Sequence, residues 1–326
     1  MNQKLSKTLK YVLSAALMVV LLYFAFRSVE WDAFLNGIRS TNFLLVAVAM
    51  CFGFSAFVFR SIRWKMLLKP LDPDISFWRV FSGVNIGNFA NCMLPFAGEI
   101  ARCGIVCTPK ANFEKTFGTI AMERIWDFVS IMFIMLLALV IEGGAVSEFF
   151  SRSVWTPLAE NFYTTWWIYV IFLAVCALAV WALFKFRKKG GVAGKVYDFF
   201  AGIGKGFISF SKMDHKGLFL TCTFCVWIMY WLMCVCIAKA FPPANSLAIS
   251  DTLFIMAVGN LASVIPVPGG FGAYHAIIAL ALSSIYGMSW QNGIVFATLS
   301  HESQAIVMIS SGVVSYILRM LGFKNK

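Results

Sequence analysis

The sequence predicts an all-α polytopic membrane protein, with six crossing helices and two re-entrant helical hairpins, or about eight spans, in two inverted repeats. Three observations carry this prediction. Hydrophobic residues make up 60% of the 326 residues and charged residues only 13%, whereas soluble domains are about 45–50% apolar and about 25% charged. Several long stretches contain no charge, and two further apolar stretches are interrupted by Pro, Gly and Asn.

Apolar stretches of membrane-spanning length, with few charged residues, define the six expected crossings. A hydrocarbon core of about 30 Å requires about 20 predominantly apolar helical residues. The first stretch follows three lysines, but it is too long for a signal peptide and no small-residue cleavage site follows it, so we expect it to be retained. The stretches that qualify are 9–26, 42–59, 117–141, 164–184, 217–238 and 293–318.

The distribution of basic residues predicts the orientation. A formal net charge of +12 would suggest nucleic acid in a soluble protein, but here the lysines and arginines lie between spans. If the N-terminus is cytoplasmic and both interrupted stretches return to their side of entry, 22 of the 27 Lys and Arg face the cytoplasm, as the positive-inside rule requires. We therefore expect a cytoplasmic-membrane protein with both termini inside, no nucleic-acid partner, and a basic loop, 185–216, lying on anionic headgroups.

The interrupted stretches, 75–98 and 252–288, match each other in order. Each contains Asn-x-Ala, then proline six or seven residues later, then glycine, and each is followed by a long helix with an acid nine residues after a glycine. The matched residues are Asn88, Pro95, Gly98 and Asp127 in the first copy, and Asn260, Pro266, Pro268, Gly269, Gly270, Gly272 and Glu302 in the second.

Two repeats are therefore expected, 1–141 and 164–326, joined by an external loop at 142–163. Three crossings in each half would invert the second copy, an arrangement typical of secondary transporters, whose substrate site lies where the broken helices meet. The alternative is that Pro and Gly merely kink ordinary membrane helices.

Charged residues near the first break suggest an anion site. Unpaired backbone N–H groups at a restarting helix favour an anion, and phosphate is the candidate. Glu99 and Arg102 lie three residues apart in the first turn after this break, and so on one helical face. Either they pair with each other, or Arg102 is the counter-ion of a phosphate and Glu99 accepts hydrogen bonds from the break.

Further ionisable residues are expected deep in the membrane. At 1.5 Å per residue Asp127 lies about 15 Å from Phe117, near the middle of the hydrocarbon core, and Glu302 lies about as deep from the opposite side. Such residues are usually functional or tightly paired. Asp127 and Glu302 are candidates for counter-charges or proton carriers, with Glu123 and Arg124 beside them; alternatively, Arg124 neutralises an acid in a purely structural pair.

Other candidate motifs are weaker. Arg60 and Arg63 end the second span, either as an interfacial anchor or as a site that gathers anionic headgroups. The nine cysteines lie in or beside apolar stretches and form no disulfide framework. The three histidines, His215, His275 and His301, have no zinc-ligand spacing, and no nucleotide-binding P-loop is present. We expect neither a metal site nor a cofactor.

Taken together, these motifs resemble the membrane domain of the lysylphosphatidylglycerol synthase/flippase family, over nearly the whole chain. The resemblance implies movement of a lipid between leaflets by the membrane domain, while a separate soluble domain attaches the amino acid; we expect that soluble domain to be absent here. The residues that carry the resemblance are Arg60, Arg63, Trp64, Gly83, Asn88, Pro95, Gly98, Glu99, Arg102, Glu123, Arg124, Asp127, Pro268, Gly269, Gly270, Phe271 and Gly272.

This chain departs from the family pattern at two places. His275 stands where an acid is common, and His301 and Glu302 lie where the family often has a basic residue. The expected function is translocation of an anionic lipid, a phospholipid or a polyprenyl-phosphate-linked intermediate. The alternative is an enzyme or accessory subunit in lipid-linked glycosyl transfer. A homo-oligomer and a complex with a lipid-biosynthesis enzyme both remain open.

Overall fold

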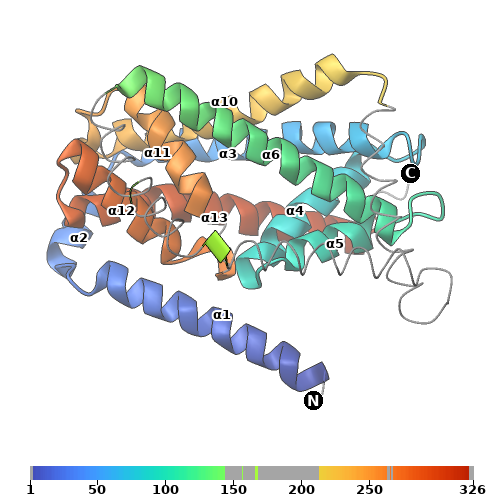
Figure 1. Cartoon of the computed structure of the whole chain (residues 1–326), viewed down its shortest axis with the longest axis horizontal. Helices are drawn as coiled ribbons and strands as arrows, with labels where there is room; N and C mark the ends of the chain where they lie inside the picture. The colour runs from blue at the N-terminus through green and yellow to red at the C-terminus, as the bar shows by residue number, and fades with distance from the viewer. Residues whose placement is uncertain are drawn as a thin grey trace.

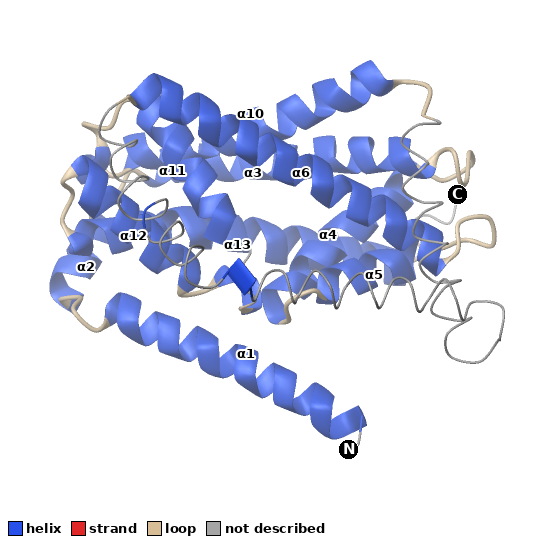
Figure 2. Ribbon diagram, viewed as in Figure 1, coloured by secondary structure: helices blue, strands red, loops and turns tan. Residues whose placement is uncertain are grey.

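The computed structural model of the chain describes residues 3–143, 213–262, 265 and 267–322, with the isolated residues 156, 166 and 167. Within these residues the fold is all-α, and Figure 2 shows only helices joined by loops. The ten α-helices are α1 (Gln3–Phe26), α2 (Trp31–Arg39), α3 (Phe43–Leu68), α4 (Phe77–Met93), α5 (Ala97–Val106), α6 (Phe113–Glu142), α10 (Lys216–Ala240), α11 (Ile249–Leu261), α12 (Ala273–Tyr286) and α13 (Trp290–Met320).

Five helical segments in the described part are long and apolar enough to cross a membrane, or six if the bent pair α1 and α2 forms one span. Four of the five are α3, α6, α10 and α13, which correspond to predicted crossings. The fifth is Pro268–Tyr286, which lies in the second interrupted stretch and includes α12. The predicted crossing 9–26 lies in α1, which qualifies only together with α2. The chain is thus an all-α, multi-pass membrane protein, as predicted. The expected span 164–184, nearly all of the external loop 142–163, most of the basic loop 185–216, and Pro266 lie outside the described residues.

Both predicted interruptions are real breaks between helices. The first separates α4 from α5 at residues 94–96, where Phe96 adopts a left-handed conformation with φ 62°. The second separates α11 from α12 and contains the short 3₁₀ helix η5 (Pro268–Gly270). Gly269, Gly270 and Gly272 all have positive φ, a conformation that glycine adopts without steric cost.

Helices α4 and α5 fold back on each other as a hairpin. Arg79, in the first turn of α4, donates hydrogen bonds to the carbonyls of Ile105 and Cys107 at the end of α5, at 2.9 and 2.7 Å. Nearby, Lys110 pairs with Asp74 at 2.6 Å. The segment before α4 and the segment after α5 therefore lie at the same end of the molecule.

Close approach inside this hairpin depends on glycine. A Cβ at Gly98 would lie 2.3 Å from the carbonyl oxygen of Gly87 and 2.5 Å from the Asn91 amide. No side chain fits there without displacing backbone. Small residues at helix contacts let backbones approach, which is how membrane helices commonly associate.

The opposite end of the molecule gathers α2, the end of α10 and the start of α13. The backbone N–H of Asn42 donates to the carbonyl of Ala240 at 2.9 Å. A Cβ at Gly37 would lie 3.2 Å from Val295 and 3.6 Å from Phe241. Figure 1 shows this end, with α2 and α12, opposite the end at which α5 finishes, while α1 runs along one edge of the bundle.

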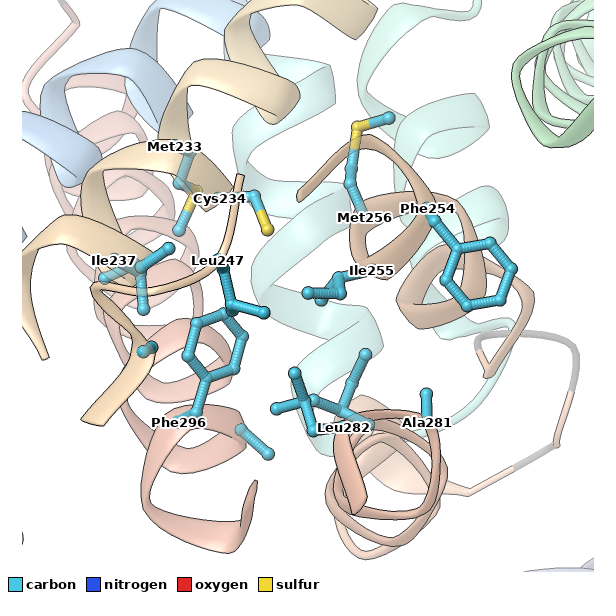
Figure 3. Packing of buried hydrophobic residues seen from close by; sticks show 14 of the residues in the cluster. Met233, Cys234, Ile237, Leu247, Phe254, Ile255, Met256, Ala281, Leu282 and Phe296 are labelled. Atoms are coloured by element: carbon cyan, nitrogen blue, oxygen red, sulfur yellow. The ribbon is translucent and has the colours of Figure 1, made fainter. Parts of the chain in front are cut away.

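The largest core lies between α10, α11, α12 and α13, and parts of α3 and α6 also contribute to it. Figure 3 shows Ile255, Leu282 and Phe296 converging from three of these helices. Because lipid tails are as apolar as leucine, the gain here comes from close packing rather than from removing side chains from water. This core packs α11 and α12, the helices on either side of the second break, against α10 and α13.

Candidate functional site

A cluster of ion pairs joins α3 to α6. Arg60 and Arg63 are three residues apart on α3 and face Glu123 and Asp127, four residues apart on α6, so that each pair shares one helical face. Arg60 Nε lies 2.8 Å from Glu123 Oε1, and its Nη2 lies 2.7 Å from Asp127 Oδ2. Arg63 Nη2 lies 3.0 Å from Glu123 Oε1 and 2.6 Å from Asp127 Oδ1.

Helix α5 adds a third arginine to the buried end of this cluster. Arg102 pairs with the other carboxylate oxygen of Glu123. Its guanidinium also lies over the Trp64 ring, 4.0 Å from the ring centroid, a cation–π contact that further stabilises the charge. Glu123 is completely buried, so three arginines converge on one carboxylate that has no access to solvent.

A fourth arginine lies at the open edge of the cluster. Arg124 Nη2 lies 2.6 Å from Glu99 Oε1, and its Nη1 lies 3.7 Å from Asp127 Oδ2. Its side chain is 44% exposed, against 0% for Arg63 and 4% for Arg102. Arg124 is therefore the arginine of the cluster most available to a ligand.

The charges of the cluster do not cancel. Four arginines (Arg60, Arg63, Arg102 and Arg124) face three carboxylates (Glu99, Glu123 and Asp127), which leaves one positive charge in excess among the described residues. Removing a charge from water is costly unless it is paired. An anion bound beside the cluster would complete its neutralisation.

The cluster borders a cavity of about 480 Å³ where the two breaks meet. Pro95 and Phe96 line it from the first break, and Gly269 and Gly270 line it from the second. The remaining wall is mixed in polarity. Its polar residues are Arg60, Asn88, Asn91, Glu99, Arg124, Asn260, Ser300, His301 and Gln304, and its apolar residues include Phe57, Met233, Met256 and Met308.

Three polar groups on residues that line the cavity are buried without a hydrogen-bond partner among the described residues. They are Asn88 Nδ2, a donor, and Glu99 Oε2 and Gln304 Oε1, both acceptors. Buried polar groups in native structures are nearly always satisfied. A ligand that carries both acceptors and donors would satisfy them.

The structure divides the residues proposed from sequence into three groups. Those that line the cavity are Arg60, Asn88, Pro95, Glu99, Arg124, Asn260, Gly269 and Gly270. Those in the ion-pair cluster behind its wall are Arg63, Arg102, Glu123 and Asp127. Gly98, Pro268, Gly272, His275 and Glu302 belong to the breaks or the helices that follow them, but are not part of the cavity lining.

The partner of Glu99 differs from the local pairing that its spacing allowed. Glu99 pairs with Arg124 of α6 rather than with Arg102 on its own helix. As a result Arg102 points at Glu123 and away from the cavity. Of the four arginines, Arg60 and Arg124 line the cavity, and Arg102 does not.

Sequence reasoning did not select Asn91, His301 or Gln304 as site residues. Asn91 Oδ1 accepts the backbone N–H of Gly98 at 2.7 Å, which satisfies one donor at the start of α5. Asn91 lies three residues after Asn88 on α4, so its i,i+3 spacing was a signal that both face the same side.

Near the second break, His275, His301 and Glu302 come together. One ligand atom of each lies within 4.8 Å of the others, a spacing that could hold a metal ion. The expectation of no metal site rested on spacing along the sequence, which does not detect ligands contributed by two different helices.

Comparison with known proteins gives one family match and one distant relative. Residues 11–312 match the family model described as "Lysylphosphatidylglycerol synthase TM region". A UPF0104 membrane protein of Pyrococcus horikoshii is 29% identical over 139 residues, which are 41% of this chain and 40% of the relative's length. No solved structure matches.

Proposed function

The chain belongs to the family of the lysylphosphatidylglycerol synthase transmembrane region, and from this we propose that it translocates an anionic lipid across the cytoplasmic membrane. The observation that carries the proposal is the cavity between the two breaks, with Arg60 and Arg124 in its wall. The excess positive charge of the adjoining cluster favours an anion there.

The chemistry of the wall matches a phospholipid or a polyprenyl-phosphate-linked headgroup. Arginine binds phosphate oxygens through two parallel N–H donors, and Arg124 is half-exposed beside the cavity. Asn88 Nδ2 supplies a further donor for the phosphate, while Glu99 Oε2 accepts from a hydroxyl or amine of the headgroup. Phe57 and the methionines give a lipid chain an apolar surface.

The proposal includes two re-entrant hairpins in inverted halves. It is supported by the return of α5 to the end at which α4 begins and by the meeting of the two breaks at one cavity. Broken helices that meet near the midplane characterise transporters built from inverted repeats. With both termini in the cytoplasm, the two hairpins reach the cavity from opposite sides of the membrane.

A role in lipid-linked glycosyl transfer receives less support. The acid pair at Asp72 and Asp74 resembles a metal-binding motif of sugar transferases, but it forms a turn in which Asp72 accepts the N–H of Asp74 at 3.3 Å. Lys110 pairs with Asp74 and lies 3.9 Å from Asp72. These contacts account for both acids without a nucleotide sugar.

Reconstitution tests the proposal. In vesicles that contain only this protein, fluorescent phosphatidylglycerol should cross between leaflets at a rate proportional to protein density. Arg124→Gln should lower the rate at least tenfold, whereas Lys110→Gln, which removes a cation outside the cavity, should leave it unchanged. Equal rates for wild type and Arg124→Gln would reject the cavity as the path, and no translocation with any anionic lipid would reject the function.

A further inference from the structure

A second constellation of polar side chains lies beside the second break, outside the arginine cluster. His275, in the first turn of α12, and His301 and Glu302, midway along α13, point their ligand atoms at one another. Glu302 Oε1 is the centre of the group, 3.1 Å from His301 Nδ1 and 3.6 Å from His275 Nε2.

The hydrogen bond of His301 fixes which of its nitrogens carries the proton. His301 Nε2 lies 2.8 Å from the carbonyl oxygen of Gly269. A carbonyl can only accept, so Nε2 carries the hydrogen, and in the neutral ring Nδ1 presents a lone pair. That lone pair faces the Glu302 carboxylate at 3.1 Å. Two acceptors at this distance repel unless a proton on Nδ1 or a metal ion lies between them.

His275 is a buried imidazole that also requires a partner. Its ring is 2% exposed, and Nδ1 is buried without a hydrogen-bond partner among the described residues. Its Nε2, at 3.6 Å from Glu302 Oε1, is beyond hydrogen-bond distance. A buried imidazole whose ring nitrogens lack hydrogen-bond partners is unusual, and ligation through Nε2 would satisfy one of them.

We propose that His275, His301 and Glu302 bind a divalent transition-metal ion of the zinc class. Zinc lies about 2.0–2.2 Å from imidazole nitrogen and carboxylate oxygen, so adjacent ligands of a tetrahedral site are about 3.3 Å apart. The two contacts of Glu302 Oε1, 3.1 and 3.6 Å, fall on either side of this value. Two imidazoles with one carboxylate is an established zinc ligand set that leaves a fourth position open.

The surroundings of His301 resemble those of metal-ligating histidines. Such histidines usually donate their second ring N–H to a carbonyl or carboxylate, which fixes the tautomer and the orientation of the ring; here the Gly269 carbonyl takes that role. The ring also packs against Phe271 and Tyr274, with centroids 4.8 and 5.2 Å away. The ligand is therefore held in place before an ion arrives.

Metal content of the purified full-length protein tests this inference independently of lipid transport. After removal of metals with a chelator and equilibration with Zn²⁺, one ion per chain should be retained. His275→Ala should abolish retention, and Glu302→Gln should weaken it by about 10- to 100-fold. His215→Ala, which removes a histidine outside the group, should retain wild-type zinc. Since imidazole ligands disfavour hard cations, Mg²⁺ should not displace the zinc.

Two further measurements exclude zinc binding by cysteine and misfolding of the Glu302→Gln variant. Co²⁺ in place of Zn²⁺ should give the visible absorption of a nitrogen and oxygen tetrahedral site, without the thiolate charge-transfer band that cysteine ligation would produce. Monodisperse elution of Glu302→Gln shows that its lower affinity is not due to misfolding. Equal zinc retention by wild type and both site variants, or no retention by wild type, would overturn the assignment; in the second case a proton shared by the three side chains is the remaining explanation.

Discussion

Arg102 of α5 and Glu123 of α6 form an ion pair in which both side chains are buried, 4% and 0% exposed. Because Glu123 also contacts Arg60 and Arg63 of α3, this carboxylate joins three helices. Helices α3, α5 and α6, which hold the cluster behind the cavity wall, therefore share this one acid as a common partner.

Glu123→Gln should strongly destabilise the protein. The amide removes the negative charge that three buried arginines share, and breaking a buried ion pair costs about 3–5 kcal/mol. Unfolding of the purified protein by denaturing detergent would measure the loss. Glu114→Gln, at the start of the same helix, should change stability by less than about 0.5 kcal/mol. Similar values for the two variants would mean that the arginines find water or other partners when Glu123 is lost.

The two glycines of α5 should respond in opposite ways to alanine. At Gly98 the new methyl group would meet the Gly87 carbonyl at 2.3 Å, whereas at Gly104 nothing lies within 4 Å. Gly98→Ala should therefore destabilise the hairpin by about 1–3 kcal/mol or more. Gly104→Ala should be neutral or stabilising by up to about 1 kcal/mol. Thermal unfolding of both variants would separate the steric cost of the new methyl group from the effect of alanine on the backbone entropy of the unfolded chain. An unchanged stability of Gly98→Ala would show that the two helices of the hairpin can move apart.

Glu99→Gln should strengthen the binding of an anionic lipid. Glu99 is the closest carboxylate to Arg124, at 2.6 Å, and it competes with any phosphate for that guanidinium. The glutamine keeps an oxygen that can accept from the headgroup, so the lost competition dominates. An ion pair with an exposed partner, here Arg124, contributes up to about 1 kcal/mol, so half-saturation of translocation should occur at about fivefold lower lipid concentration. A rise in the half-saturating concentration would show that the carboxylate's own contact with the headgroup outweighs its competition for Arg124. The Glu114→Gln variant again serves as the control.

Single cysteines should report the proposed topology. In a cysteine-free background, Asp74→Cys and Lys110→Cys should react with an impermeant thiol reagent from the same, cytoplasmic side, since their side chains form an ion pair at 2.6 Å. Asn245→Cys should react from outside. Labelling of residue 74 in intact cells would show that the orientation is the reverse of the proposed one. Labelling of residue 245 from the cytoplasm would show that the proposed topology of the second half is wrong.

Hydropathy and helix-breaking residues predicted most of the fold in the described part of the chain. The expected stretches 117–141, 217–238 and 293–318 each fall within one observed helix, and 42–59 begins one residue before α3. Both interruptions occur where Pro and Gly indicated. These features depend on the length of apolar stretches and on the backbone preferences of Pro and Gly, both of which can be read from a single sequence. The inverted relationship between the halves is a long-range property and remains a proposal.

The partners of the charged residues could not be predicted in the same way. Spacing on α5 allowed Glu99 to pair with Arg102, but Arg124 and Glu123, from another helix, are their partners. A pairing three residues apart is visible in sequence, whereas one that spans 25 residues depends on how helices pack. For the same reason His275 and His301 were not expected to share a metal ion, because 26 positions and a change of helix separate them.

The same cluster has a consequence for how the protein is made. Arg60 leaves the ribosome 63 residues before Glu123, and at about 5–20 residues per second this interval lasts roughly 3–13 s. An unpaired arginine costs up to about 2.5–3.5 kcal/mol on insertion scales, with the largest cost at the bilayer centre, and α3 carries two near the end of its predicted crossing. Helix α3 is therefore expected to wait at the membrane interface or in the translocon until α6 emerges. Release of the two helices into lipid is then a joint event.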